Sequence, residues 1–240
     1  MRKQTSFLII GKGRMAKHMI AYCQLLNIDF KDWSRPDSQD KLLKLCNESS
    51  HIFILITDTD IDKFILDNEL HKLKKTLVHF SGASISPYAI SAHPLMTFGP
   101  ETYSLETYRK ILFVCEKNRE KFENIIPGFP NKYAYIKAKD KAYYHCLGAL
   151  ANNFTTILWQ TYFDELEDKF NIKHQDAFPI LEQTFKNIKL DYKTALTGPL
   201  SRGDQKTLDN HLTVLKNSPL KDIYTGFTKL FESKKGNSIL

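Results

Sequence analysis

The stretch "FLIIGKGRMAKHM", residues 7–19, decides the fold, because a short apolar run ends at a glycine, admits one lysine and takes a second glycine before a helical pattern begins. Residues 6–10 have the composition of a buried strand. After Gly13, apolar side chains recur at the spacing of an amphipathic helix up to Leu26. The stretch is therefore a nucleotide-binding turn or an ordinary strand–turn–helix connection, and the rest of the chain has to distinguish the two.

Strand and helix patterns alternate up to about residue 138. We expect strands over residues 6–10, 28–33, 51–57, 76–80, 110–115 and 133–138, and helices over 13–26, 42–45, 60–70 and 118–126. Such alternation predicts a mostly parallel sheet with helices on both faces. Beyond residue 139 only helices are expected: one long helix over 139–170, then shorter ones over 176–188, 206–216 and 220–231. The fold class is thus α/β, with a mostly parallel sheet domain over 1–139 and an all-helical domain over 140–240.

Composition excludes several classes of protein. The chain has 240 residues, and no run approaches the 18 apolar residues of a membrane-spanning helix. The apolar run 7–10 is too short for the core of a signal peptide, so we expect a cytoplasmic protein with no membrane partner. The net charge of +7 comes from dispersed lysines without a block of five basic residues. This indicates a solvated surface, or a basic cleft for acidic ligands, rather than a nucleic-acid partner.

The four cysteines carry no metal-binding or disulfide signature. Cys23, Cys46, Cys115 and Cys146 are widely separated, and no CxxC pair or Cys/His ligand spacing occurs. We therefore expect a reducing compartment, no metal, and thiols that are buried, including Cys146.

The opening glycines fit the pattern G-x-G-x-x-A between a strand and a helix. The first glycine permits the tight turn, the second lets the backbone approach a pyrophosphate, and the small third residue lets helix and strand pack closely. The free N–H groups at the start of the helix then face the anion. The residues expected to hold a dinucleotide here are Gly11, Lys12, Gly13, Arg14, Met15 and Ala16.

The end of the second strand indicates which dinucleotide binds. "DWSRP" places Ser34 and Arg35 about twenty residues beyond the glycines. A guanidinium can pair with a 2′-phosphate through two parallel hydrogen bonds, which favours NADP(H) as the cofactor. If the strand ended two residues earlier, Asp32 would instead take the place of the acid that holds the ribose in NAD enzymes.

Polar residues also follow the third and fourth strands. Thr57 and Asp58 end one strand, and Ser81 and Gly82 end the next. Ligands of such sheets bind at the carboxyl ends of the strands, so these loops should flank the cofactor. An equal alternative is that Asp58 lies at the N-terminus of a helix, with Thr57, Asp58 or Thr59 as its cap.

A second group of residues is rich in histidine, lysine and asparagine. His93 lies in "SAHPLMTFG", where Pro94 and Gly99 indicate irregular backbone. Lys141, His145, Gly148 and Asn152 share one face of the long helix, and Asn153 lies about 80° from that face. The alternative is that this helix face is polar because it is exposed to solvent. We favour a functional face because the turns that follow, "TTILWQTYF", are expected to be buried on most sides.

The third group lies in "ALTGPLSRGDQKTLDNH", residues 195–211. Thr197, Arg202, Asp204 and His211 are candidates for binding the substrate, with Arg202 suited to hold a carboxylate. The alternative is an inter-helix loop with an exposed arginine, in which Asp204 caps the next helix.

Five motifs in order resemble a known group: "GKGRMA", "SGA", "HPLMTF", "YHCLGALANNF" and "LTGPLSRGD". The chain resembles Rossmann proteins with a second helical domain of poorly defined function, within the 6-phosphogluconate dehydrogenase-like superfamily, and especially an alternate class of ketopantoate reductase. The resemblance implies hydride transfer from NADPH to a C=O or C=N group in a cleft between the domains. It also implies that the first helix of the second domain supplies Lys and Asn, here Lys141, Asn152 and Asn153.

The expected reaction is reduction of a small 2-keto acid, ketopantoate by resemblance, with His145 or Lys141 donating the proton to the alkoxide. Imidazole titrates near neutral pH in water, which favours His145. Asn152 or Asn153 would hold the substrate or the carboxamide, Arg202 the carboxylate, and His93 would line the nicotinamide end. An imine reductase of pyrroline type and a non-catalytic NADPH-binding protein remain alternatives. The long apolar helix would suit a homodimer.

Overall fold

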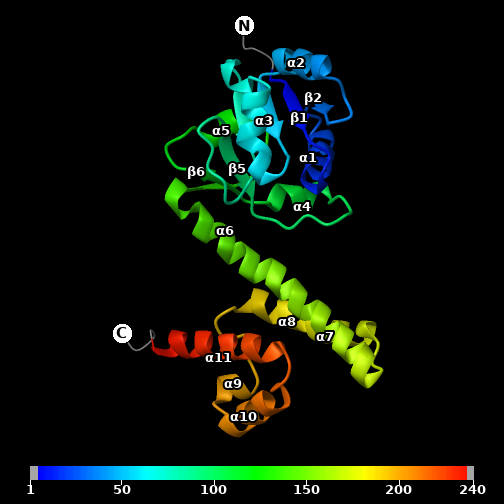
Figure 1. Ribbon diagram of the computed structural model, residues 1–240, viewed down its shortest axis with the longest axis vertical. Helices are drawn as coiled ribbons and strands as arrows, with labels where there is room; N and C mark the ends of the chain where they lie inside the picture. The colour runs from blue at the N-terminus through cyan, green and yellow to red at the C-terminus, as the bar shows by residue number, and fades with distance from the viewer. Residues whose placement is uncertain (1–4, 237–240) are drawn as a thin grey trace. The chain divides into compact units, whose positions relative to one another are not determined.

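The computed structural model describes residues 5–236 and divides into two compact units, between Trp159 and Gln160 (Figure 1). The sheet lies entirely in the first unit. The sequence places the domain boundary near residue 139, where the last strand ends, and the compact units divide 20 residues later, inside a long helix. Among the helices of the described residues, none is long and apolar enough to cross a membrane.

A seven-stranded sheet in the order β2-β1-β3-β4-β5-β6-β7 forms the first unit. Every adjacent pair is parallel except β5 and β6, which run antiparallel. The strands are β1 (Phe7–Ile10), β2 (Phe30–Trp33), β3 (His51–Ile54), β4 (Thr76–His79), β5 (Ile90–Pro94), β6 (Phe113–Glu116) and β7 (Tyr133–Ile136). The predicted α/β class with a mostly parallel sheet is confirmed.

Helices connect these strands and follow the last one. The first unit contains α1 (Arg14–Leu25), α2 (Gln39–Glu48), η1 (Asp58–Asp60), α3 (Ile61–Asp67), η2 (Leu70–Lys72), α4 (Leu105–Lys110), α5 (Phe122–Ile125), η3 (Ala138–Asp140), α6 (Lys141–Ala149) and η4 (Leu150–Phe154). Helix α7 (Thr155–Phe170) spans the division. The second unit continues with η5 (His174–Ala177), α8 (Phe178–Leu190), α9 (Pro199–Arg202), α10 (Gln205–Val214) and α11 (Leu220–Gly236).

Two hydrophobic cores lie on opposite faces of the sheet. Phe7 and Ile9 of β1 face the core that includes α1 and α4, whereas Leu8 and Ile10 face the core of α2 and α3. All four side chains are buried. Successive strand residues point to opposite faces, so a strand covered on both sides has to be apolar throughout. This explains the continuous apolar run that opens the chain.

The sequence predicted neither strand β5 nor helix α4. Irregular backbone was expected at residues 91–94, and a strand was expected to begin at Lys110, and both expectations were wrong because α4 ends at Lys110 and β6 begins at Phe113. Pro94 suggested irregular backbone, but it is the last residue of β5, where a missing N–H is tolerated. The helix expected over 118–126 shrinks to α5. Asn118 adopts a left-handed conformation with φ of 67°, which no helix can include.

The long helix after residue 139 forms, but η4 interrupts it as a turn of π-helix. A π-turn rotates less per residue than an α-turn, so the face shared by Lys141, His145 and Gly148 does not extend with α-helical spacing to Asn152. The expectation that "TTILWQTYF" is buried was wrong, because α7 contains no buried residue in this chain. The expectation of a buried Cys146 was also wrong: this thiol is exposed, whereas Cys23, Cys46 and Cys115 are buried.

Candidate functional site

A cavity of about 790 Å³ opens at the carboxyl ends of β1 to β4. It lies where open parallel sheets bind ligands, next to the point at which the strand order reverses. The lining includes nine of the residues expected to contact a dinucleotide: Gly11, Lys12, Gly13, Arg14, Met15, Ser34, Arg35, Thr57 and Asp58. Ser81 lines it as well, whereas Ala16 and Gly82 are buried and are not part of the lining.

Gly11 makes the tight turn after β1 possible. Its φ is +133°, which side chains rarely adopt, and an added Cβ would lie 2.2 Å from the carbonyl oxygen of Leu55. The N–H of Gly11 donates to the Trp33 carbonyl oxygen at 3.0 Å. Gly11 therefore fixes the turn through contacts within the protein.

Gly13 differs, because nothing in the described structure lies within 4 Å of an added Cβ and its φ is an ordinary −72°. It precedes α1, whose start has no side-chain cap and no acidic residue in the first turn. The first intrahelical bond runs from Lys17 N–H to the Gly13 carbonyl oxygen, so the preceding amides have no intrahelical partner. With Lys12 and Arg14 beside it, this uncovered turn fits a bound pyrophosphate.

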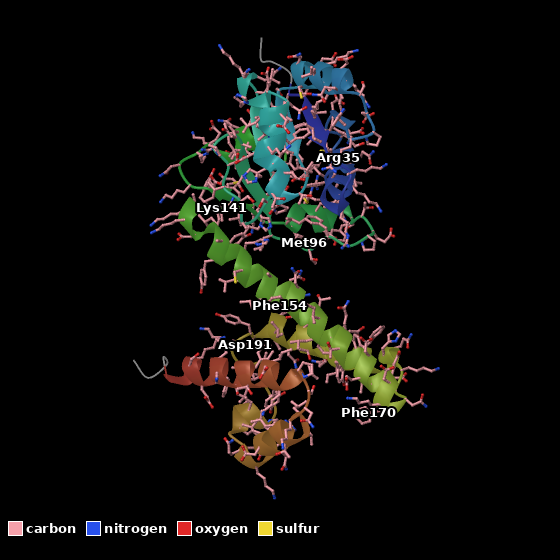
Figure 2. The ribbon with its side chains drawn as sticks, viewed as in Figure 1. Arg35, Met96, Lys141, Phe154, Phe170 and Asp191 are labelled. Atoms are coloured by element: carbon pink, nitrogen blue, oxygen red, sulfur yellow. The ribbon has the colours of Figure 1, made fainter. Side chains whose placement is uncertain are left out.

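The loop after β2 borders the same cavity. Ser34 and Arg35 line it, and Asp32 lies within β2, outside the lining. The guanidinium of Arg35 is exposed and lies 3.6 Å from the Asp60 carboxylate (Figure 2). The strand therefore ends where the phosphate-binding alternative requires, with the exposed Arg35 bordering the cavity and paired with Asp60.

Asp58 and Ser81 connect the ends of β3 and β4. The Ser81 hydroxyl donates to the Asp58 carboxylate at 2.5 Å and accepts from the Ala83 and Ser84 N–H groups. Neither Thr57 nor Asp58 makes a side-chain cap to η1. Asp58 nevertheless begins η1, and Thr57 occupies its N-cap position, as the capping alternative expected. The Asp58 carboxylate bonds to Ser81 instead of capping the helix.

Two histidines meet over Gly82. An added Cβ at Gly82 would lie 2.4 Å from Cδ2 of His145 and 2.9 Å from Nε2 of His93. The two imidazole rings meet edge to face with centroids 5.8 Å apart. Gly82 is therefore required by the packing of His93 of β5 against His145 of α6. Neither histidine lines the cavity, but Ser81, the residue before Gly82, does.

His93 also contacts Tyr144, whose hydroxyl lies 2.8 Å from His93 Nδ1. Burial, with smaller effects of His145 and Lys141, lowers the pKa of His93 to about 4. Burial raises the pKa of Tyr144 to about 12. Both groups are therefore neutral at physiological pH.

Lys141 begins α6 and is buried, unlike a solvated helix face (Figure 2). Its ammonium lies 3.1 Å from Oε1 of Glu116, which is also buried, and Nε of Arg119 lies 3.9 Å from the second carboxylate oxygen. Burial lowers the pKa of Lys141, against the opposing effect of Glu116. The ion pair attaches the start of α6 to the end of β6.

His79 and Glu116 were missed by the sequence reasoning. His79 ends β4 fully buried, and neither ring nitrogen has a hydrogen-bond partner in the part of the chain described. Burial, with Lys141 and Arg119 adding to it, lowers the pKa of His79 to about 3. Its place inside an apolar strand gave no signal for a polar cluster.

The remaining predicted site residues make no hydrogen bond to His93 or His145 in the described structure. Asn152 and Asn153 are exposed on η4, where the amide of one donates to the other. In the second unit, Thr197 and Arg202 are exposed, Asp204 caps α10 through the N–H and hydroxyl of Thr207, and His211 bonds to the Tyr224 hydroxyl. The capping alternative for Asp204 is thus confirmed.

Solved structures with the same fold cover nearly the whole chain. A candidate NADP oxidoreductase of Bacteroides fragilis is 17% identical, with a TM-score of 0.73 over 96% of this chain and 98% of that one. An imine reductase of Streptomyces aurantiacus is 13% identical, with a TM-score of 0.64 over 95% and 94%. Pyrroline carboxylate reductase of Plasmodium falciparum, solved with NADP bound, is 15% identical, with a TM-score of 0.58 over 96% and 96%. These likenesses establish the Rossmann-type fold followed by a helical region.

Sequence comparisons say less about activity. No curated protein matches the chain. The family model of a domain of unknown function, DUF2520, matches residues 113–230, just under half of the chain. That segment contains "YHCLGALANNF" and "LTGPLSRGD", the two motifs that carried most of the resemblance to Rossmann proteins with a poorly defined helical domain.

Proposed function

We propose that the chain is an NADPH-dependent reductase of a small C=O or C=N compound that carries a carboxylate. The observation that supports this most directly is the pairing of two features in one unit. An uncapped helix start opens on a large cavity, and two histidines pack on Gly82, the residue that follows Ser81 of the cavity lining.

The residues fit a phosphorylated dinucleotide. Gly13 leaves space against the first turn of α1, and Lys12 and Arg14 supply positive charge there. Ser34 and Arg35 border the place where a 2′-phosphate would lie. Two of the proteins with the same fold are described with NADP, which favours the phosphorylated cofactor.

When bound, the reduced nicotinamide supplies the hydride. The chain's own residues then have to orient the substrate and handle its charge. The exposed imidazole of His145 lies against Gly82 and is the group we assign as proton donor to the oxygen or nitrogen that gains charge. Lys141 is held by Glu116 and would act by positioning α6. Arg202, exposed in the second unit, is our candidate for holding a carboxylate.

Two substrates follow from two observations. The sequence motifs resemble an alternate class of ketopantoate reductase, which favours ketopantoate. Two of the proteins with the same fold reduce imines or pyrroline carboxylate by name, which favours a cyclic imine acid. Both are small carboxylates with one reducible double bond.

The cofactor site is tested by Gly13→Ala, with Gly226→Ala as the matched control. Both positions accept a Cβ without contact in the described structure. We expect Gly13→Ala to weaken NADPH binding at least 10-fold, measured by calorimetry or fluorescence titration, with unfolding unchanged, because the methyl group blocks the pyrophosphate. Gly226→Ala should bind normally. Equal binding by both variants, or a preference of the wild type for NADH, would contradict the assignment.

The activity is tested by NADPH oxidation with ketopantoate, other 2-keto acids and pyrroline carboxylate. His145→Ala should lower kcat about 100-fold with NADPH affinity retained, as expected for loss of a general acid. Unchanged kcat would remove His145 from the mechanism. NADPH binding without reduction of any compound in the panel would favour a non-catalytic NADPH-binding protein.

A further inference from the structure

Tyr144, which the sequence did not single out, completes the histidine cluster. Its hydroxyl lies 2.8 Å from His93 Nδ1, and the two rings meet edge to face with centroids 5.6 Å apart. We infer that Tyr144 is a positioning residue that holds His93 as the Nε2–H tautomer, a neutral hydrogen-bond donor to the reducible C=O or C=N of the substrate. The inference rests on the proposed reductase function.

The direction of the hydrogen bond follows from the two groups. A phenol is a donor of moderate acidity, and an unprotonated imidazole nitrogen is a much better acceptor than a phenol oxygen. A neutral imidazole has one N–H, and the bond made by one nitrogen decides where that hydrogen lies. Because Tyr144 donates to Nδ1, the hydrogen of His93 lies on Nε2.

His93 stays neutral over the working pH range. Burial lowers the pKa of His93 to about 4. His145 and Lys141 of α6 lower this pKa further, because they disfavour a positive charge on the His93 ring. A neutral donor can polarise a carbonyl without first being protonated itself. The role therefore differs from that of His145, which is exposed and transfers its proton.

Nε2 of His93 lies against Gly82. It is the His93 atom nearest to an added Cβ at Gly82, at 2.9 Å, so it lies over the α-carbon of a residue without a side chain. No hydrogen-bond partner for Nε2 exists within residues 5–236. Ser81, the residue before Gly82, lines the cavity. We take this unpaired N–H, which lies against Gly82 one residue along the chain from Ser81 of the cavity lining, as the donor to the substrate.

The tautomer can be measured directly on the full-length chain by the ¹⁵N shifts of its imidazoles. We expect Nε2–H for His93 in the wild type and a loss of that preference in Tyr144→Phe, which removes only the hydroxyl. Tyr143→Phe is the matched control, because Tyr143 is the adjacent tyrosine and is 71% exposed. Nδ1–H in the wild type, or an unchanged tautomer in Tyr144→Phe, would overturn the inference.

A kinetic cycle tests the role of the donor. Tyr144→Phe should lower kcat about 10-fold or more in the wild type and have no further effect in a His93→Phe background. If Tyr144→Phe lowered kcat equally in the wild type and in the His93→Phe background, Tyr144 would have a structural role that does not act through His93, and the inference would be overturned. A chain with the expected tautomer that reduces nothing supports the tautomer and contradicts the proposed function instead. A wrong tautomer in an active enzyme contradicts this inference alone.

Discussion

At the scale of single residues, the two glycines next to the cavity have opposite reasons to be glycine. Gly11 is fixed by its conformation and by the Leu55 carbonyl, and Gly13 has open space around it. Gly82 belongs to a third kind, because side chains press on it from two elements. Glycine is therefore needed for the tight backbone turn at Gly11, for space next to a ligand at Gly13, and for the packing of two histidines at Gly82.

The role of Gly82 leads to a prediction for Gly82→Ala. A methyl group there would lie within 3 Å of both His93 and His145, so both rings have to move. A displacement of about 1 Å at a reacting group can lower turnover about 100-fold, and we expect a loss of kcat of that order with NADPH affinity unchanged. Steady-state kinetics and a binding titration measure the two quantities. Normal turnover with weakened NADPH binding would instead show that Gly82 contacts the cofactor.

The buried histidines make stability depend on pH. The pKa values of His79 and His93 are about 3 and about 4 in the folded chain, against an ordinary 6.5 when unfolded. Between these limits the unfolded chain binds more protons. The contribution of these histidines to the free energy of unfolding is therefore fully present well above pH 6.5 and is lost as the pH falls toward 4. At pH 5 the loss is about 2 kcal/mol per histidine.

His79→Leu should flatten this decline, because it removes a polar ring without partners and keeps a similar volume. Urea unfolding of the wild type and variant at pH 7, 6 and 5 gives the free energies. His71→Leu is the control, since His71 is exposed on η2 and should leave the slope unchanged. The same slope in wild type and His79→Leu would refute the burial argument.

At the scale of elements, the Lys141–Glu116 pair attaches α6 to β6. We expect Lys141→Met to lower the free energy of unfolding by about 3 kcal/mol, because Glu116 would remain buried with only Arg119 at 3.9 Å. Adding Glu116→Gln should recover part of the loss, since it removes the uncompensated charge. Chemical unfolding of the single and double variants measures this, and additive losses would show that the pair is not coupled.

The elements also show what the sequence could reveal. The glycine turn was predictable because its residues are adjacent and its periodicity changes at Gly13. Strand β5 was not, because Pro94 at its end imitates a loop. The bond between Tyr144 and His93 joins residues 51 apart, and the Lys141–Glu116 pair joins residues 25 apart. Such contacts depend on which strand ends lie beneath α6, and no local pattern encodes that.

At the scale of the whole molecule, the two units differ in how much core they have. Two cores cover both faces of the sheet in the first unit. Within residues 160–234, only Ala177 and Leu208 are buried apolar residues. Leu190 is 87% exposed and Val214 79% exposed. A unit with so little buried apolar surface has little to offset the entropy of folding on its own.

We therefore predict that two copies of the chain associate through their helical units. Large exposed apolar surfaces mark interfaces, and a closed dimer is the commonest way to cover them. Light scattering after gel filtration should give twice the mass of the chain at micromolar concentration. The melting temperature should rise with protein concentration, because association stabilises only the folded chain. Leu190→Lys with Val214→Lys should shift the mass toward the monomer, whereas Lys31→Glu on the edge strand β2 should not. A wild-type monomer whose melting temperature is independent of concentration would show that the helical unit is stable without a second copy.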